Sequence, residues 1–106
     1  MSLNYNSALL KTLKTPLLDE IRSVQADLKS VDEGAKRPDE ISLRGIANIH
    51  GSFMMMGYPS MINVSTNIKS SLEKLQAAEK SGWDRPRIAA VSKLCFNLIG
   101  QLADHV

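Results

Sequence analysis

The chain has 106 residues, of which 43% are hydrophobic and 23% charged, and its formal net charge is +2. This length suits a single domain over residues 1–106, and the apolar content is sufficient for a packed core. With 13 basic and 11 acidic residues spread along the chain, the charge balance argues against nucleic acid or an anionic membrane as a partner.

The sequence leads us to expect neither a membrane span nor an export signal. The longest uncharged apolar runs, Phe53–Met56 among them, are far shorter than a membrane span. Residues 1–6 lack the basic-then-apolar pattern of a signal peptide. We therefore expect a cytoplasmic protein. Its single cysteine, Cys95, has no partner for an internal disulfide, and we expect it to pack in the core.

Apolar residues recur at three- and four-residue spacing from the N-terminus onward, which predicts helices. The first stripe consists of Leu10, Leu13, Leu17, Ile21, Val24 and Leu28. Pro16 interrupts it, and Thr15 is a suitable N-cap for a helix with proline at its first position. We expect a short opening helix and then a longer helix from Pro16 to about Val31. The polar residues 32–37 form a loop.

A second long helix is expected from Pro38 to Gly57, because proline favours a helix start and glycine a C-cap. The third helix begins at Pro59. After a turn at residues 81–84, the last helix opens at Pro86. The stripe of the third helix is Met61, Val64, Ile68, Leu72 and Leu75, and that of the last is Ile88, Val91, Cys95, Leu98 and Leu102.

These elements predict an all-α fold without strands. Amphipathic helices joined by short loops are typical of an antiparallel up-and-down four-helix bundle, here with a short additional N-terminal helix. Because the connection around Tyr58 is very short, the second and third helices must form an adjacent hairpin.

Residues 45–57 read Gly-Ile-Ala-Asn-Ile-His-Gly-Ser-Phe-Met-Met-Met-Gly. This segment resembles the signature of histidine phosphotransfer (HPt) domains, in which His-x-Leu-Lys-Gly-Ser is followed by a second glycine. The run Ile49–Ser52 fits Leu-Lys-Gly-Ser, and Gly57 fits the second glycine. The phospho-histidine position holds Ala47. Outside residues 44–73 the resemblance is limited to helix number and length.

The resemblance implies a module of a two-component phosphorelay that binds a response-regulator receiver domain or a histidine kinase. Since a methyl group cannot carry phosphate, Ala47 implies binding without phosphotransfer, and we expect no enzyme activity. On a helical wheel, Ser42, Ile46, Ile49, Phe53 and Met56 share the core arc. Ala47 lies about 140° from the centre of that arc and therefore faces solvent.

The residues around Ala47 form the predicted partner-binding set. This set consists of Leu43, Arg44, Ala47, Asn48, His50, Gly51, Met54 and Met55. A glycine inside a helix costs about 1 kcal/mol relative to alanine, so Gly51 indicates a need for space on the outward face. Met54 and Met55 suit an adaptable contact surface. Alternatively, they are covered by residues 4–14 or by a neighbouring domain.

His50 is the alternative phosphate acceptor. It lies three residues from the usual position, and in-line transfer requires close placement of the reacting atoms. A supporting role for His50 in the HPt pattern is therefore favoured over phosphotransfer. A further alternative, from another functional class, is a structural bundle that self-associates through its methionine-rich face.

No other chemistry is indicated. Two histidines and one cysteine on different segments do not form a metal-ligand set, and we expect no metal, cofactor or small-molecule substrate. His105 is expected to be a solvated residue near the C-terminus. The acidic pairs 19–20 and 39–40 stand at expected helix starts, where carboxylates favour the helix dipole.

Overall fold

The computed structural model describes the backbone of residues 7–106 and the side chains of residues 11–106. Within these residues all regular structure is helical. The elements are α1 (Ser7–Asp32), the 3₁₀ helix η1 (Pro38–Glu40), α2 (Arg44–Met56), α3 (Pro59–Gln76), α4 (Arg85–Leu102) and the 3₁₀ helix η2 (Ala103–His105). The predicted all-α class with four α-helices is confirmed for the described part of the chain.

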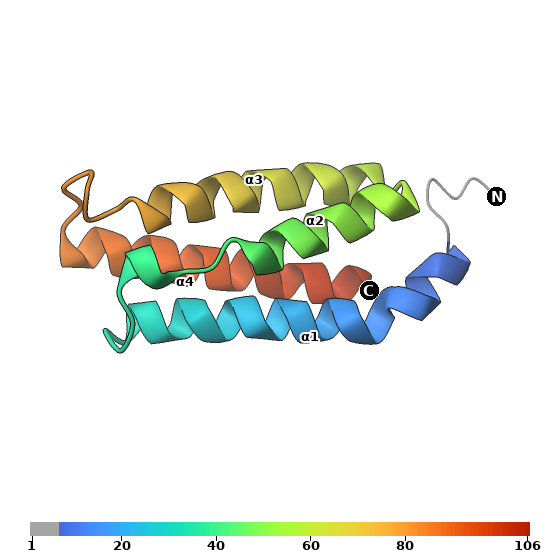
Figure 1. Cartoon of the computed structure of the whole chain (residues 1–106), viewed down its shortest axis with the longest axis horizontal. Coiled ribbons are helices and arrows are strands. Elements are labelled where there is room, and N and C mark those ends of the chain that lie inside the picture. Colours follow the sequence, from blue (N-terminus) through green and yellow to red (C-terminus); the bar gives the residue numbers. More distant parts are fainter. Residues whose placement is uncertain (1–6) are drawn as a thin grey trace.

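The four helices lie side by side along one long axis, and the molecule measures 48 × 21 × 18 Å. Figure 1 shows that each α-helix runs along this axis. The α2–α3 connection lies at the same end as the start of α1 and the C-terminus, and the α1–η1 and α3–α4 connections lie at the other end.

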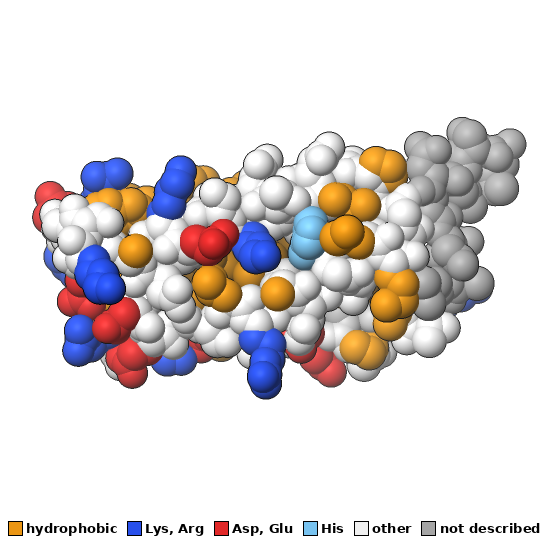
Figure 2. Space-filling view, turned by 45° about the horizontal axis from the view of Figure 1, so that its top comes forward, with side chains coloured by type: hydrophobic (Ala, Val, Ile, Leu, Met, Phe, Trp, Pro, Cys, Tyr) orange, Lys and Arg blue, Asp and Glu red, His pale blue; other side chains and the backbone are white. Residues whose placement is uncertain are grey.

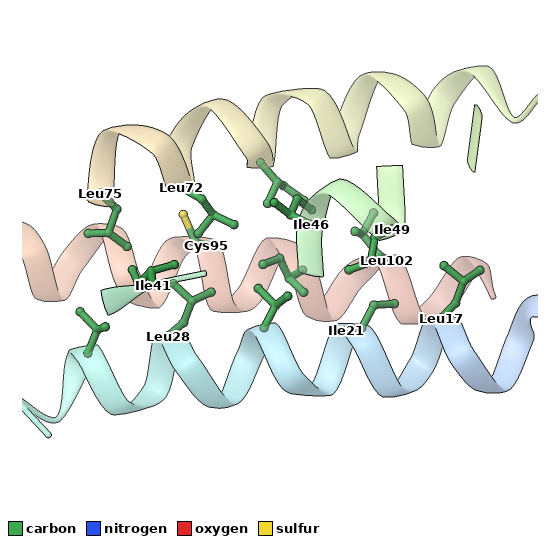
Figure 3. Close-up of a cluster of buried hydrophobic side chains, with 14 of the residues drawn as sticks. Leu17, Ile21, Leu28, Ile41, Ile46, Ile49, Leu72, Leu75, Cys95 and Leu102 are labelled. Atoms are coloured by element: carbon green, nitrogen blue, oxygen red, sulfur yellow. The ribbon is translucent and has the colours of Figure 1, made fainter. Parts of the chain in front are cut away.

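One continuous apolar core runs between the helices (Figure 3). Its largest fully buried side chains are Phe53, Ile21, Leu28, Ile46, Ile49, Ile68, Leu72, Leu75, Ile99 and Leu102. Every helix contributes residues at three- or four-residue spacing, as amphipathic packing requires. Burial of such side chains stabilises the fold by about 1.5–3 kcal/mol each before entropic costs. Cys95 is buried in this core, and burial raises the pKa of its thiol.

The predicted helix start at Pro16 is wrong. A single helix, α1, begins at Ser7 and continues through Pro16 to Asp32, and no separate short helix precedes it among the described residues. Proline removes one backbone hydrogen bond and crowds the preceding turn, which bends a helix without necessarily ending it. The first turns of α1 are set at an angle to the rest (Figure 1). Asp19 and Glu20 consequently lie inside α1 and not at a helix start.

The predicted start of the second helix at Pro38 is also wrong. Pro38 opens only the short η1, and Ile41 then turns the backbone extended, with φ −65° and ψ 128°. Ile41 is buried, and its carbonyl accepts a hydrogen bond of 2.8 Å from Gln76 Nε2 on α3. The break places Ser42 outside α2, where it is exposed and does not join the core face.

Two other helix boundaries follow the predicted chemistry, whereas the turn predicted at residues 81–84 begins earlier, because α3 ends at Gln76. Gly57 caps α2 in the left-handed conformation, with φ 65°, and Pro59 is the first residue of α3. Asp84 caps α4, and its Oδ1 accepts from the Arg87 backbone N–H at 3.0 Å. None of the helices in residues 7–106 combines the length and the apolarity needed to cross a membrane.

Candidate functional site

Helix α2 packs one side against the core and exposes the other side to solvent. Ile46, Ile49, Phe53 and Met56 are buried. The outward residues are Arg44, Ala47, Asn48, Gly51 and Met55, and all are exposed. The structure therefore agrees with the predicted orientation of Ala47. The roles assigned to these residues stay predictions.

His50 is half-buried and tied to α3. Its Nδ1 lies 2.8 Å from Oγ of Ser65, a fully buried residue. The single hydroxyl hydrogen of Ser65 is donated to the Ile62 carbonyl at 3.0 Å. The Ser65 hydroxyl thus joins the His50 ring to the backbone of α3.

This hydrogen bond holds His50 on the α3 side of α2. An offset of three residues displaces its Cα from that of Ala47 by about 4.5 Å along the helix axis and about 60° around it. The imidazole therefore lies beside position 47 and not at it. It supports the surface beside that position.

The structure adds three α3 residues that the sequence analysis missed, Ile62, Ser65 and Lys69. Ser65 holds His50, and Lys69 follows Ser65 by one turn on the same side of α3, half-buried. Ile62 is also half-buried. Figure 2 shows this side of the molecule, where a histidine lies between hydrophobic side chains and a basic one. The sequence does contain one signal for this contact: Ser65 lies four residues after Met61 and three before Ile68, on the core side of the third helix. A buried hydroxyl requires a hydrogen-bond partner.

Two members of the predicted set point elsewhere. Asn48 Nδ2 donates to Glu20 Oε1 of α1 at 3.2 Å. Arg44 lines a hollow between α1 and α2 that also contains Glu20 and Asp27. The predicted set is therefore divided. Leu43, Ala47, His50 and Met54 follow the α3 side of α2, whereas Arg44 and Asn48 lie toward α1. We call the first four residues, with Ile62 and Lys69, the α2–α3 face.

Met54 and Met55 are 57% and 67% exposed. The described residues thus leave both thioethers largely uncovered. The predicted cover by residues 4–14 falls partly outside the described residues. Flexible exposed thioethers are suited to adaptable contacts.

The two glycines of α2 have different surroundings. A Cβ at Gly45 would lie 2.6 Å from Cγ2 of Val24, so glycine allows α1 and α2 to approach closely. A Cβ at Gly51 would meet nothing within 4 Å. Packing inside the described molecule therefore explains Gly45 and leaves Gly51 unexplained.

Replacing each glycine by alanine tests this difference. In both variants alanine stabilises the helix by about 1 kcal/mol relative to glycine. The difference between their free energies of unfolding therefore reports the steric cost at Gly45. We expect Gly45→Ala to be less stable than Gly51→Ala by about 1–3 kcal/mol, the usual cost of overpacking. Urea denaturation measures both free energies of unfolding. Equal stabilities would contradict the close approach at Gly45.

Outside the α2–α3 face, the described residues offer few groups suited to catalysis or metal binding. No three His, Cys, Asp or Glu side chains among residues 11–106 come close enough to hold a metal ion. His105 is exposed, with Nδ1 3.3 Å from the Tyr58 hydroxyl. A mainly apolar groove of about 340 Å³ lies between α1 and α4, lined by Leu28 and Phe96 among others, and shares no residue with the α2–α3 face.

Comparisons with protein-family models, curated proteins and solved structures give no significant match.

Proposed function

We propose that this protein is an HPt-like signalling module of a two-component phosphorelay, which binds a receiver domain or a histidine kinase and does not carry phosphate. With it we propose that the helices form the antiparallel up-and-down bundle of that family and that the protein acts in the cytoplasm. It then works as a competitor, adaptor or regulatory module and not as an enzyme.

One observation carries this proposal. Ala47 is exposed in the first turn of α2, and one turn later Gly51 presents open space. A glycine in an exposed helix interior lowers stability by about 1 kcal/mol, and nothing in the described fold requires it at this position. A partner that docks on this surface would explain the glycine, because the lack of a side chain lets another surface approach the helix backbone closely. The half-buried His50 and the exposed methionines supply polar and apolar contacts beside it.

The proposal predicts binding without phosphate transfer. A phosphorylated receiver from the same organism should form a complex with the protein, detected by calorimetry, and should leave no acid-labile phosphate on it. Added in excess, the protein should slow phosphate transfer from that receiver to an HPt domain with an intact histidine. Label on the protein at the level of the competent domain would contradict the no-transfer claim.

A second candidate function is phosphotransfer through His50. Ser65 engages Nδ1 of His50, so Nε2 is the ring nitrogen that lies outside this hydrogen bond. This candidate predicts label that disappears in His50→Gln. Sedimentation of the wild type and of Met55→Glu completes the experiment. An oligomer that dissociates in the variant would instead support a structural bundle that self-associates through its exposed methionines.

A further inference from the structure

We infer that the groove between α1 and α4 binds a small organic anion, in which a single carboxylate is attached to a compact apolar body. The groove shares no residue with the α2–α3 face, so the inference goes beyond the proposed function and does not depend on it. The shape of the groove, the groups on its floor and the charges at its edge each support it.

The groove lies between two points where α1 and α4 are joined by hydrogen bonds. At one end Gln25 Nε2 of α1 donates to the backbone carbonyl of Phe96 on α4 at 3.3 Å. Gly100 makes room for this contact, because a Cβ there would lie 2.8 Å from Gln25 Nε2. At the other end Arg85, the first residue of α4, donates through Nη2 to the carbonyl of Asp32, the last residue of α1 (Figure 1). The groove is therefore held open by the packing of the two helices and needs no rearrangement to form.

The floor of the groove offers apolar contacts. Leu28 and Phe96 line it, together with the fully buried Ser92. The Ser92 hydroxyl donates to the Ile88 carbonyl at 2.7 Å, so its hydrogen is engaged within α4. The volume of about 340 Å³ is at the lower end for small-molecule sites, which often lie between the helices of bundles. These properties suit a compact apolar ligand body such as a fused ring.

The edge of the groove carries a small excess of positive charge. Lys29 of α1 and Lys93 of α4 both line the groove and are exposed. Within residues 11–106 neither lysine forms an ion pair. Asp32 is the one acidic side chain among the described lining residues, so two positive charges and one negative charge leave a net charge of +1. A ligand with one carboxylate complements this charge and accepts hydrogen bonds from the ammonium groups.

The test uses three naphthalene compounds of similar size and different charge. At neutral pH 2-naphthoate is an anion, 2-naphthamide is neutral and 2-naphthylmethylamine is a cation. Each is titrated into the isotope-labelled protein, and the amide chemical shifts in NMR spectra give the dissociation constant and the place of binding. A ligand with about 13 non-hydrogen atoms should have a dissociation constant of about 1 mM or lower. We expect naphthoate to bind about tenfold more tightly than the amide, because its hydrogen bonds are charge-assisted, and the amine to bind most weakly.

Variants of the two lysines test the role of charge without disturbing the core. Lys29→Glu and Lys93→Glu should each reduce the preference for naphthoate over the amine by about tenfold, and the double variant should prefer the amine. The matched control is Lys74→Glu, at an exposed position of α3 that does not line the groove. It changes the net charge equally and should keep the preference.

Variants of Ser92 test the role of shape. Ser92→Leu places a larger side chain in the groove and should weaken the binding of all three compounds. Ser92→Ala removes the hydroxyl without adding volume and should leave the affinities unchanged. Circular dichroism checks that each variant folds, and the lysine variants test the inference independently if Ser92→Leu does not fold.

Several results would overturn the inference. These are the absence of naphthoate binding at about ten times the expected dissociation constant, equal affinity for naphthoate and the amine, and a naphthoate preference that survives in the double lysine variant. Chemical-shift changes confined to residues outside the groove would also overturn it. A wild-type dimer in sedimentation that Lys93→Glu converts to a monomer would place a second copy of the chain in the groove instead. Each of these results leaves the proposed function of the α2–α3 face intact.

Discussion

Replacing Ala47 by histidine is expected to create a phosphate acceptor where the wild-type protein has none. Position 47 is exposed, the turn after it is bare at Gly51, and His50 stands beside it. A histidine here would reach solvent without displacing a neighbour. Phosphoryl transfer requires the imidazole nitrogen to come into near contact with the phosphorus atom of the donor. An exposed ring at position 47 would allow a donor to approach in this way.

The measurement uses phosphoramidate, a small donor that passes its phosphoryl group to an imidazole nitrogen and releases ammonia. Intact-mass and peptide mass spectrometry should show Ala47→His gaining an acid-labile phosphate at position 47. In the wild type only background modification of His50 and His105 is expected. Made in a His50→Gln background, the variant should still be labelled at position 47, because the introduced histidine is itself the acceptor.

A matched control is Ala47→Gln, which adds a side chain of similar reach without a nucleophile and should stay unlabelled. With a phosphorylated receiver as donor, the histidine variant should also take up phosphate from the protein partner. If Ala47→His folds and phosphoramidate leaves position 47 unmodified, the exposed geometry assigned to this position is wrong. If phosphoramidate labels it and no receiver does, the HPt-like function loses its support.

Much of the fold follows from apolar spacing and turn chemistry. The third stripe correctly placed Met61, Ile68 and Leu72 in the core, and Gly57 ended α2 as its left-handed conformation allows. Proline was the main source of error. Pro16 favours a helix start in the sequence but is tolerated within α1, whereas Pro38 opens only a single 3₁₀ turn. At Ile41 the burial of the side chain in an extended backbone is more favourable than continuing the helix. Local helix propensity does not reveal such tertiary effects.

The wheel predicted the outward direction of the candidate site but not its extent across α3. Ala47 and Gly51 were placed correctly because helix geometry alone determines their direction. The pairing of His50 with Ser65 depends on the register between α2 and α3, which no single-helix pattern contains. For the same reason Lys69 was missed. The separation of Arg44 and Asn48 toward α1 likewise results from how the helices pack.

The three consecutive methionines of α2 provide the second large expected effect. Met56 is 2% exposed, whereas Met54 and Met55 are 57% and 67% exposed. Truncation of a buried methionine to alanine removes transfer energy and leaves a cavity, which costs about 2–5 kcal/mol. We expect that loss in Met56→Ala, while Met54→Ala and Met55→Ala should change the free energy of unfolding by about 0.5 kcal/mol or less. Thermal and urea unfolding of the three variants measure the difference.

The same three variants separate folding from binding. A domain of this size is stable by about 5–15 kcal/mol, so Met56→Ala removes a large share of its stability yet leaves the outer surface of α2 unchanged. At a temperature where all three variants are folded, receiver affinity should fall in Met54→Ala and Met55→Ala and persist in Met56→Ala. The opposite pattern, with binding lost only together with stability, would mean that the exposed thioethers do not contact the partner. The burial of one methionine and the exposure of its two neighbours thus assign stability and recognition to opposite sides of the same helical turn.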